Sequence, residues 1–239
     1  MLTVTEALKQ RMSTREFRQQ PLAEHLVREI LDVARWAPSG GNLQPWKVIA
    51  VAGAEREAVI ELARRTHAAG GPDESTERPV YPSNLWEPYR TRRFKVGEDL
   101  YALLGIPRSD RPARLAQFAR NYQMFGAPVE LFFVIDERMG HGQWAHLGMF
   151  MQSIALAALE RGVSSCMQEA WAALRHSLKR HFTLDEHELV YCGMALGYAD
   201  ETAAVNSLRS ERAPVEEFAS FRGFSLGTES RERPRLVRE

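Results

Sequence analysis

The sequence contains little cysteine and no excess of either charge. Two cysteines in 239 residues exclude a small disulfide scaffold, which would need many more. Lys and Arg total 31, and so do Asp and Glu, which gives a formal net charge of zero. Proteins held to nucleic acid by its phosphates are usually basic, and disordered chains combine low hydrophobicity with high net charge. The composition therefore predicts a folded protein without a nucleic-acid partner.

Long apolar runs are also missing. The most apolar stretch, residues 147–159, contains Gln152 and Ser153 and is too short to span a bilayer. The first ten residues are polar and charged, unlike the apolar core of a secretory signal. Neither Cys166 nor Cys192 lies in a CxxC motif. We expect a cytoplasmic protein with reduced, structural thiols and no membrane association.

The common catalytic motifs do not occur. There is no HExxH, and the pairs His141/His146 and His176/His181 are five residues apart, which does not place them on one helical face. There is also no GxSxG, GxGxxG or GxxxxGK[ST]. The sequence therefore predicts no metal site and no catalytic nucleophile, and we name no catalytic residue.

The hydrophobic pattern alternates between helices and strands. The spacing Thr3-x-x-Glu6 is a capping box and predicts a helix near the N-terminus. Helical periodicity predicts further helices over 23–36, 55–67, 96–104, 107–125, 143–161 and 171–181. Short apolar runs predict strands over 46–51, 128–136, 163–168 and 189–197. This order is typical of a sheet with helices packed on it, in one domain over 1–239 with an excursion at about 70–125.

The first candidate ligand site follows the N-terminal helix. Arg11, Ser13 and Arg15 occupy alternate positions, and alternate side chains of an extended segment point the same way. Two guanidinium groups and a hydroxyl would then converge on one anion, and a phosphate suits the forked donors of arginine. The alternative is a solvated, basic helix end.

The second candidate is the segment P-S-G-G-N-L-Q-P-W at residues 38–46. Its prolines restrict the backbone, its glycines permit close approach of a flat ligand, and Asn42 and Gln44 offer amide groups. The alternative is a tight loop between a helix and a strand.

These two segments, in this order, resemble the FMN-dependent nitroreductase family, in particular its nitrobenzoate and nitroaromatic reductase-like subgroup. Later segments agree in order: G-M-F-M-Q-S at 148–153, G-V-S-S-C-M-Q at 162–168, G-M-A-L-G-Y at 193–198 and N-S-L-R at 206–209. The sequence departs from the family pattern at His146, where an acidic residue is usual, and at Met167, where proline is usual.

The resemblance implies an α+β fold with three layers, in which helices flank a central, mainly antiparallel sheet. It also implies a homodimer with two FMN sites at the subunit interface. The phosphate and ribityl chain of FMN would be held by Arg11, Ser13, Arg15 and Arg209, and Asn206 would also belong to the cofactor site.

The resemblance also implies residues around the flavin ring. The partner subunit would supply Pro38, Ser39, Gly40, Asn42 and Gln44. The reactive edge of the ring would be lined by Met167, Gln168 and Glu169.

The chemistry implied by the resemblance belongs mostly to the cofactor. NADPH or NADH would deliver a hydride to FMN, and a nitroaromatic or quinone-like acceptor would then take two electrons in a ping-pong cycle. Two other possibilities remain open at this point. One is a related flavoenzyme that dehalogenates aromatic rings or fragments flavin, and the other is a flavin-binding protein without enzymatic activity.

The excursion carries the question of substrate specificity. Residues 78–125 contain nine basic and four acidic residues, with aromatic residues between them. Its segment at 81–90, Y-P-S-N-L-W-E-P-Y-R, resembles the nitroaromatic reductase subgroup, and we expect four aromatic residues to contact the acceptor: Trp86, Tyr89, Phe94 and Tyr122. An arginine could pair with a carboxylate of the acceptor or a phosphate of the nicotinamide dinucleotide. The alternative is a solvated basic face over ordinary core aromatics.

Overall fold

The computed structural model describes residues 2–70 and 79–224. They divide into two units, with the boundary between Arg209 and Ser210, and each unit is described by itself. The part of the excursion at 71–78, including Arg78 of its basic set, lies outside the described residues. The expectation of one domain over the whole chain stays a prediction.

The first unit is built on a four-stranded sheet. Its strands are β1 (Lys47–Ala52), β2 (Val129–Asp136), β3 (Ser164–Gln168) and β4 (Glu188–Gly197). They lie in the order β1-β2-β4-β3, and each neighbouring pair is antiparallel. Strand β3 is therefore an edge strand, and its outer side is available to other parts of the chain or to a ligand.

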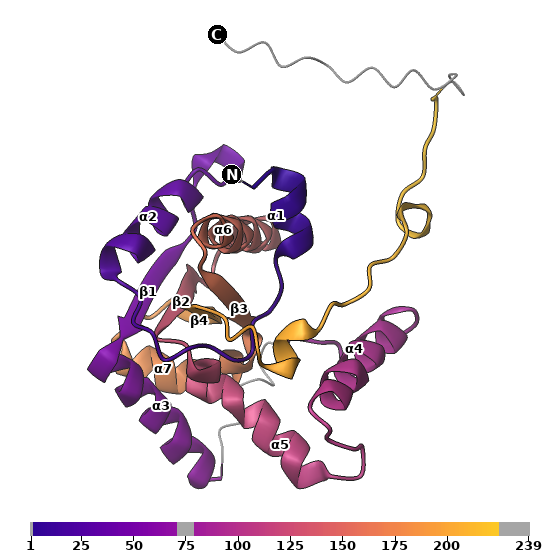
Figure 1. The fold of residues 1–239 in the computed structure, drawn as a ribbon. Coiled ribbons are helices and arrows are strands. Elements are labelled where there is room, and N and C mark those ends of the chain that lie inside the picture. The colour runs from indigo at the N-terminus through magenta and orange to yellow at the C-terminus, as the bar shows by residue number, and fades with distance from the viewer. Residues whose placement is uncertain (1, 71–78, 225–239) are drawn as a thin grey trace. The chain divides into compact units, whose positions relative to one another are not determined.

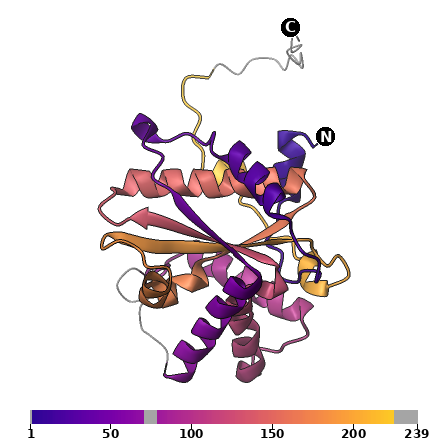
Figure 2. The ribbon, with the colours of Figure 1, turned by 90° about the vertical axis from the view of Figure 1, so that its left-hand side faces the viewer.

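Helices cover both faces of this sheet (Figures 1 and 2). One face carries α1 (Val4–Gln10), α2 (Glu24–Ala34) and α6 (His141–Glu160). The other face carries α3 (Gly53–Ala68), α5 (Arg111–Ala119) and α7 (Arg175–His181). The three layers and the antiparallel sheet confirm the predicted α+β fold.

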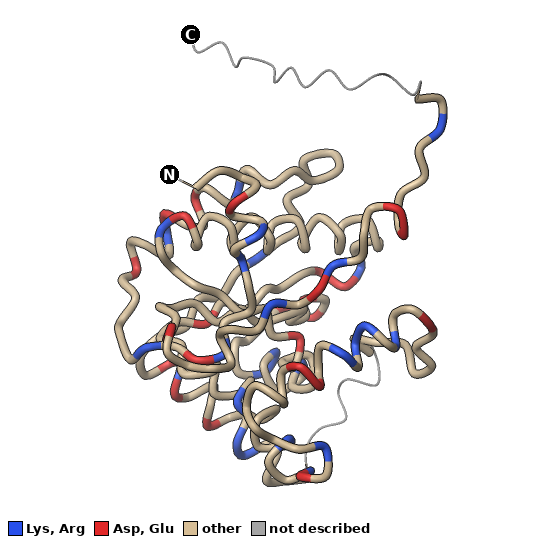
Figure 3. The backbone as a smooth tube through the Cα atoms, turned by 45° about the vertical axis from the view of Figure 1, so that its right-hand side comes forward, with Lys and Arg blue, Asp and Glu red and all other residues tan. Residues whose placement is uncertain are grey.

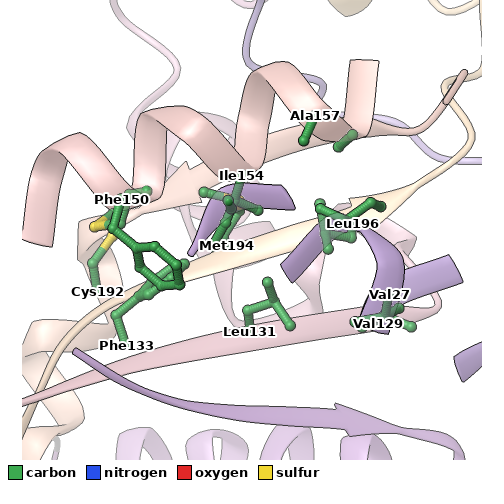
Figure 4. Packing of buried hydrophobic residues seen from close by; sticks show 14 of the residues in the cluster. Val27, Val129, Leu131, Phe133, Phe150, Ile154, Ala157, Cys192, Met194 and Leu196 are labelled. Atoms are coloured by element: carbon green, nitrogen blue, oxygen red, sulfur yellow. The ribbon is translucent and has the colours of Figure 1, made fainter. Parts of the chain in front are cut away.

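Strand β2 is buried on both sides because helices cover both faces of the sheet. Leu131 and Phe133 point to the α2–α6 side, where Ile154 and Met194 belong to the same core (Figure 4). Phe132 points to the α3–α7 side. One strand thus joins the two hydrophobic cores.

Helix α6, which the sequence predicts over 143–161, is the central helix of its layer. It lies between α1 and α2 and packs against both (Figure 1). Leu147, Phe150 and Ile154 are buried on its inner face, whereas Met149 is exposed. Residues 147–159 are apolar because α6 covers the hydrophobic core with its inner face and carries exposed apolar residues such as Met149 on its outer face.

Two predicted boundaries in the excursion are wrong. Helix α4 spans Tyr89–Leu103 and begins well before residue 96, where the sequence predicts its start. Since none of its residues is buried, no apolar stripe marked it in the sequence. The helix expected over 107–125 is interrupted: α5 ends at Ala119, and a 3-10 segment, η2 (Arg120–Gly126), follows it with left-handed φ values at Met124 and Phe125.

The second unit consists of residues 210–224 in the described part of the chain. It contains one short 3-10 turn, η5 (Val215–Glu217). Its large aromatic side chains, Phe218, Phe221 and Phe224, are exposed, and the ring centroids of Phe221 and Phe224 lie 5.9 Å apart.

Candidate functional site

The Arg11–Arg15 segment lies along the outer edge of β3. Ser13 forms a parallel β-bridge with Ser165, and the backbone N–H of Thr14 donates to the carbonyl of Ser165 at 3.0 Å. The segment is therefore extended after α1, which is the conformation that the convergence of Arg11, Ser13 and Arg15 requires. Thr14 is buried, whereas Ser13 and its two arginine neighbours are half-buried.

Asn206 fixes this segment to the rest of the unit. It lies in the 3-10 turn η4 (Ala204–Ser207), and its side-chain amide is buried. Its Oδ1 accepts a hydrogen bond from the backbone N–H of Arg15, and its Nδ2 donates to the carbonyls of Glu16 and Asp200, each at 2.8 Å. The structure thus shows Asn206 positioning the segment through its backbone.

A cavity of about 620 Å³ opens beside this segment. Its walls come from the end of α1, the last turns of α6, the start of β3 and the residues around η4. Three basic residues, Lys9, Arg11 and Arg209, line it against one acidic residue, Glu201. We call it the basic cavity. Its volume falls within the range of small-molecule sites, and its charge favours an anion.

Two of the predicted ligands, Arg209 and Arg15, contact backbone carbonyls. The guanidinium of Arg209 donates to the carbonyls of Asn206 and Leu208 at 3.1 Å. Arg15 donates to the carbonyl of Ser13 at 3.4 Å. Of the predicted phosphate-binding residues, Arg11, Asn206 and Arg209 line the basic cavity, whereas Ser13 and Arg15 lie on the segment beside it and do not line it.

The positive charges of Arg11 and Arg15 affect the pKa of Cys166 on strand β3. Burial raises the pKa of the Cys166 thiol on β3 to about 11. The charges of Arg15 and Arg11 and a hydrogen bond with Ser13 oppose that rise in pKa. The thiol is a protonated core group, as expected for a structural cysteine.

The other predicted ligands from β3 lie at its C-terminal end. Met167 is half-buried and packs toward the α2–α6 core, whereas Gln168 is only 1% exposed. The Nε2 of Gln168 donates to the carbonyl of Asn121 at 2.7 Å. Glu169 is half-buried and begins the 3-10 segment η3 (Glu169–Leu174), and burial raises the pKa of its carboxyl. The Gln168 side chain therefore belongs to the core, while its backbone remains on the edge strand.

The 38–44 loop has an unusual backbone conformation. Gly41, Asn42 and Gln44 all have left-handed φ values, between 48° and 61°, in and beside the short turn η1 (Gly40–Asn42). The Oγ of Ser39 accepts from the backbone N–H of Gln44 at 2.9 Å. Non-glycine residues in this region of φ/ψ space store strain, which is typical of functional loops.

Contact with α6 places this loop far from the basic cavity. The backbone N–H of Gly40 donates to Nδ1 of His146 at 3.3 Å, near the start of α6. The basic cavity instead contacts Ala155 and Leu159, near the end of the same helix. At 1.5 Å per residue the separation along the helix is roughly 14–20 Å, and Figure 2 shows η1 and α1 at opposite ends of α6. One chain therefore does not bring the two predicted halves of the site together.

The aromatic residues of the excursion divide into two groups. Trp86, Tyr89 and Phe94 lie on or just before α4 and are 58%, 49% and 51% exposed. Helix α4 packs next to η4, which borders the basic cavity. Tyr122 is buried in the core instead, where its hydroxyl donates to the carbonyl of Ala170 at 3.1 Å. It thus contacts the segment after β3 through the backbone of Ala170.

Many basic residues of the excursion have nearby partners. Ion pairs join Arg90 to Glu87, Lys95 to Asp99, Arg114 to Glu98 and Arg120 to Glu16. Arg93 and Arg108 stack on the rings of Tyr81 and Phe94. Figure 3 accordingly shows basic and acidic residues interspersed along the chain. The positive excess of the excursion is thus largely neutralised or used locally.

The motifs in the sequence missed two residues near the predicted site. His146 contacts Gly40, and only its departure from the family pattern drew attention to it. Glu130 is a fully buried acidic residue on β2. Its signal in the sequence is one acidic residue inside the apolar run V-E-L-F-F-V-I-D.

Two further properties concern only the part of the chain that the structure describes. None of its helices has the length and apolar character needed to cross a membrane. No three of its His, Cys, Asp or Glu side chains group together as ligands for a metal ion.

Comparison with known proteins gives consistent matches over nearly the whole chain. A sequence model described as "Nitroreductase family" matches residues 8–198. A 4-nitrobenzoate reductase of Pseudomonas putida is 38% identical over 90% of this chain and 93% of its own length. A nitrobenzene nitroreductase of Ectopseudomonas oleovorans is 34% identical over 91% of this chain and 96% of its own length. The crystal structure of the FMN and NADPH-dependent nitroreductase NfnB from Sphigopyxis sp. strain HMH matches with a TM-score of 0.89, at 40% identity over 93% of this chain and 100% of that chain.

Proposed function

Because the chain belongs to the nitroreductase family, we propose that it is an FMN-dependent NAD(P)H oxidoreductase that reduces nitroaromatic compounds. The single observation that carries the proposal is the basic cavity at the edge of β3, bordered by the Arg11–Arg15 segment and Arg209. An extended segment with alternating donors and a cavity of this charge fit a flavin mononucleotide, which carries a phosphate at one end and a flat ring at the other.

The residues present fit FMN in their chemistry. Arg11 and Arg209, which line the basic cavity, would hold the phosphate through charge-assisted hydrogen bonds. Ser13 and Arg15, half-buried on the extended segment beside the cavity, would bind the ribityl chain. Among the described residues, the bridge between Ser13 and Ser165 is the one isolated β-bridge on the outer edge of β3. Past this bridge, toward the C-terminal end of β3, the backbone at 167–169 would line the flavin ring. Asn206 acts indirectly in this proposal, by holding the backbone of the 11–15 segment.

Bound FMN supplies the redox chemistry, since it accepts a hydride from a nicotinamide donor and transfers two electrons to an acceptor. The chain's own contribution is to bind the phosphate, orient the ring along β3 and exclude water. No protein nucleophile is needed for this chemistry, and no nucleophile motif occurs in the sequence. NADPH and NADH both remain candidates for the donor, and buried thiols together with such a donor fit a cytoplasmic reaction.

The working unit in this proposal is a homodimer. The two halves of the predicted site lie at opposite ends of α6 in one chain. A second copy related by a twofold axis across α6 would bring the 38–44 loop of one chain to the basic cavity of the other. The outer surface supports this arrangement, because Leu8, Trp36 and Met149, on or next to α1, α2 and α6, are 52%, 79% and 44% exposed.

The acceptor in this proposal is a flat aromatic compound. Trp86, Tyr89 and Phe94 are exposed on a segment next to η4 and offer ring faces for stacking. Two relatives matched over nine-tenths of the chain, described above, are a nitrobenzoate and a nitrobenzene reductase, which favours nitro-group reduction over dehalogenation or flavin fragmentation.

The purified protein and its visible spectrum test the proposal. We expect a yellow protein, or a colourless one that takes up FMN, whose absorbance bleaches when NADPH or NADH is added without oxygen. Adding 4-nitrobenzoate should restore the oxidised spectrum. A protein that fails to bind FMN, or a bound flavin that no nitroaromatic reoxidises, would contradict the proposal.

A further inference from the structure

Glu130 is a buried acid that the proposed chemistry does not use. It lies on β2, the strand covered on both faces, and its side chain has no solvent exposure. Neither carboxyl oxygen has a hydrogen-bond partner of regular geometry among the described residues. Burial raises the pKa of Glu130 well above its usual value, although the indole N–H of Trp171 and the charge of Arg56 oppose the rise. Because burial of an unpaired, ionised carboxylate costs free energy, the protonated form of Glu130 is favoured.

The surroundings of Glu130 have room for its carboxyl together with Trp171. Glu130 is opposite Ala195 in the sheet, and Gly193 lies two residues before Ala195 on β4. A Cβ atom at Gly193 would lie 2.2 Å from Oε1 of Glu130 and 2.4 Å from Cδ1 of Trp171. The carboxyl and the indole therefore share the space above a glycine, and any side chain there would displace one of them.

Trp171 belongs to the segment that follows the predicted flavin edge. It is fully buried in η3, and Tyr122 and Phe132 contact its ring edge-to-face at centroid distances of 5.3 and 5.2 Å. Tyr122 also binds the carbonyl of Ala170, the residue immediately before Trp171. The turn at residues 169–171 is thus held by side chains of the α3–α7 core.

The indole N–H of Trp171 has no acceptor of regular geometry among the described residues. Since the carboxyl of Glu130 borders the same space and its pKa responds to that N–H, it is the acceptor that the packing offers. The other charged groups that act on Glu130 or on the neighbouring thiols of β3 and β4 are Arg56 from α3, Glu169 from η3, and Arg11 and Arg15 of the extended segment.

We propose that Glu130 is a positioning residue of the flavin site: its carboxyl fixes the Trp171 indole and, through it, the backbone of residues 169–170. This inference rests on the proposed function, because it assigns the turn to the edge of the FMN ring. A neutral acid suits such a place, since it accepts the indole hydrogen bond without adding negative charge near a site that receives electrons. An apolar residue of similar size would fill the space but leave the indole N–H without an acceptor.

The test compares Glu130→Leu with Glu130→Gln in the full-length chain. Removal of a buried acid and loss of the acceptor for the indole N–H have opposite effects on stability, so Glu130→Leu should fold with a melting temperature within about 5 °C of the wild type. It should nevertheless weaken FMN binding by at least about tenfold, measured by quenching of flavin fluorescence. Glu130→Gln keeps a side-chain acceptor and should bind FMN within about threefold of the wild type.

Two further variants complete the test, one as a control for the loss of a buried polar group and one as a substitute for Glu130→Leu. Ser177→Ala removes a buried polar group from α7 and should leave FMN affinity unchanged. Gly193→Ala should displace the pair of Glu130 and Trp171 and weaken FMN binding as Glu130→Leu does, so it replaces that variant if the leucine chain fails to fold. The indole N–H resonance of Trp171, assigned with a Trp171→Phe variant, should shift in Glu130→Leu and much less in Glu130→Gln.

The outcomes separate this inference from the proposed function. Normal FMN binding by the wild type together with equal binding by Glu130→Leu, or by Gly193→Ala in its place, would overturn the positioning role alone. A loss of FMN binding in Glu130→Gln as large as in Glu130→Leu would also overturn it, because the acceptor would then not be the feature that matters. A wild type that binds no FMN would overturn the proposed function and this inference with it.

Discussion

At the scale of single residues, the predicted ligands differ in what their side chains contact. Arg11 and Arg209 line the basic cavity, where they border the space for an anion. The side chains of Asn206 and Gln168 are buried and donate to backbone carbonyls, although Asn206 also borders the cavity. The motifs mark all four residues equally, because a one-letter pattern does not tell a ligand from the residue that positions it.

The first prediction concerns the stability that Asn206 provides. Asn206→Ala removes three hydrogen bonds to backbone groups, at about 1 kcal/mol each, so the free energy of unfolding should fall by about 3 kcal/mol. Urea denaturation measures the change. Ser207→Ala, which removes one exposed bond to the carbonyl of Ala204, is the control and should change stability by less than about 0.5 kcal/mol. Equal stability of the two variants would contradict this role for Asn206.

The second prediction concerns the thiol of Cys166. Its raised pKa, about 11, means that the folded state keeps the proton at a pH where the unfolded state has lost it. The stability contributed by the protonated thiol is therefore lost as the pH rises from about 9 toward 11. At pH 8 the native protein should resist iodoacetamide at Cys166, and unfolded protein should react, as read by mass spectrometry. Rapid modification of Cys166 in the native protein would show that the thiol is exposed or ionised.

At the scale of elements, the long apolar elements of the core were predictable, whereas the start of α4 and the end of α5 were not. Strand β2 and helix α6 have long apolar patterns because both pack in the cores of the sheet, and the sequence predicts both. Helix α4 has no buried residue, so its start was missed. The break after α5 depends on the left-handed residues Met124 and Phe125, and neither residue type indicates such a conformation.

The third prediction concerns the exposed aromatic residues on and before α4. Trp86→Ala should raise the KM for a nitroaromatic acceptor by about 3–10-fold, because it removes a ring face that can stack on the acceptor. Affinity for FMN should stay unchanged. Leu115→Ala, at an exposed residue of α5 in the same excursion, should leave both quantities as in the wild type. A loss of FMN in Trp86→Ala would assign the indole to the cofactor, and an unchanged KM would remove Trp86 from the acceptor site.

At the scale of the whole molecule, the 38–44 loop and the basic cavity are the two parts of one predicted site, and α6 separates them. The motifs identify both parts because each is a short segment with its own pattern. The family resemblance implied that the partner subunit supplies the loop, but the residue pattern alone does not give the separation within one chain, because it depends on the length of α6 and on which end each segment contacts. A site assembled from two chains accounts for the separation and for the exposed apolar residues around α6.

The most direct test of the composite site mixes two defective chains. Arg209→Ala damages the cavity half, and the double variant Asn42→Ala, Gln44→Ala damages the loop half, so each homodimer should bind FMN poorly. In a heterodimer of the two, one site carries both defects and the other carries none. After unfolding and refolding of an equal mixture, about one quarter of the sites should therefore bind FMN with wild-type affinity. A mixture that binds no more FMN than the separate variants would contradict the composite site.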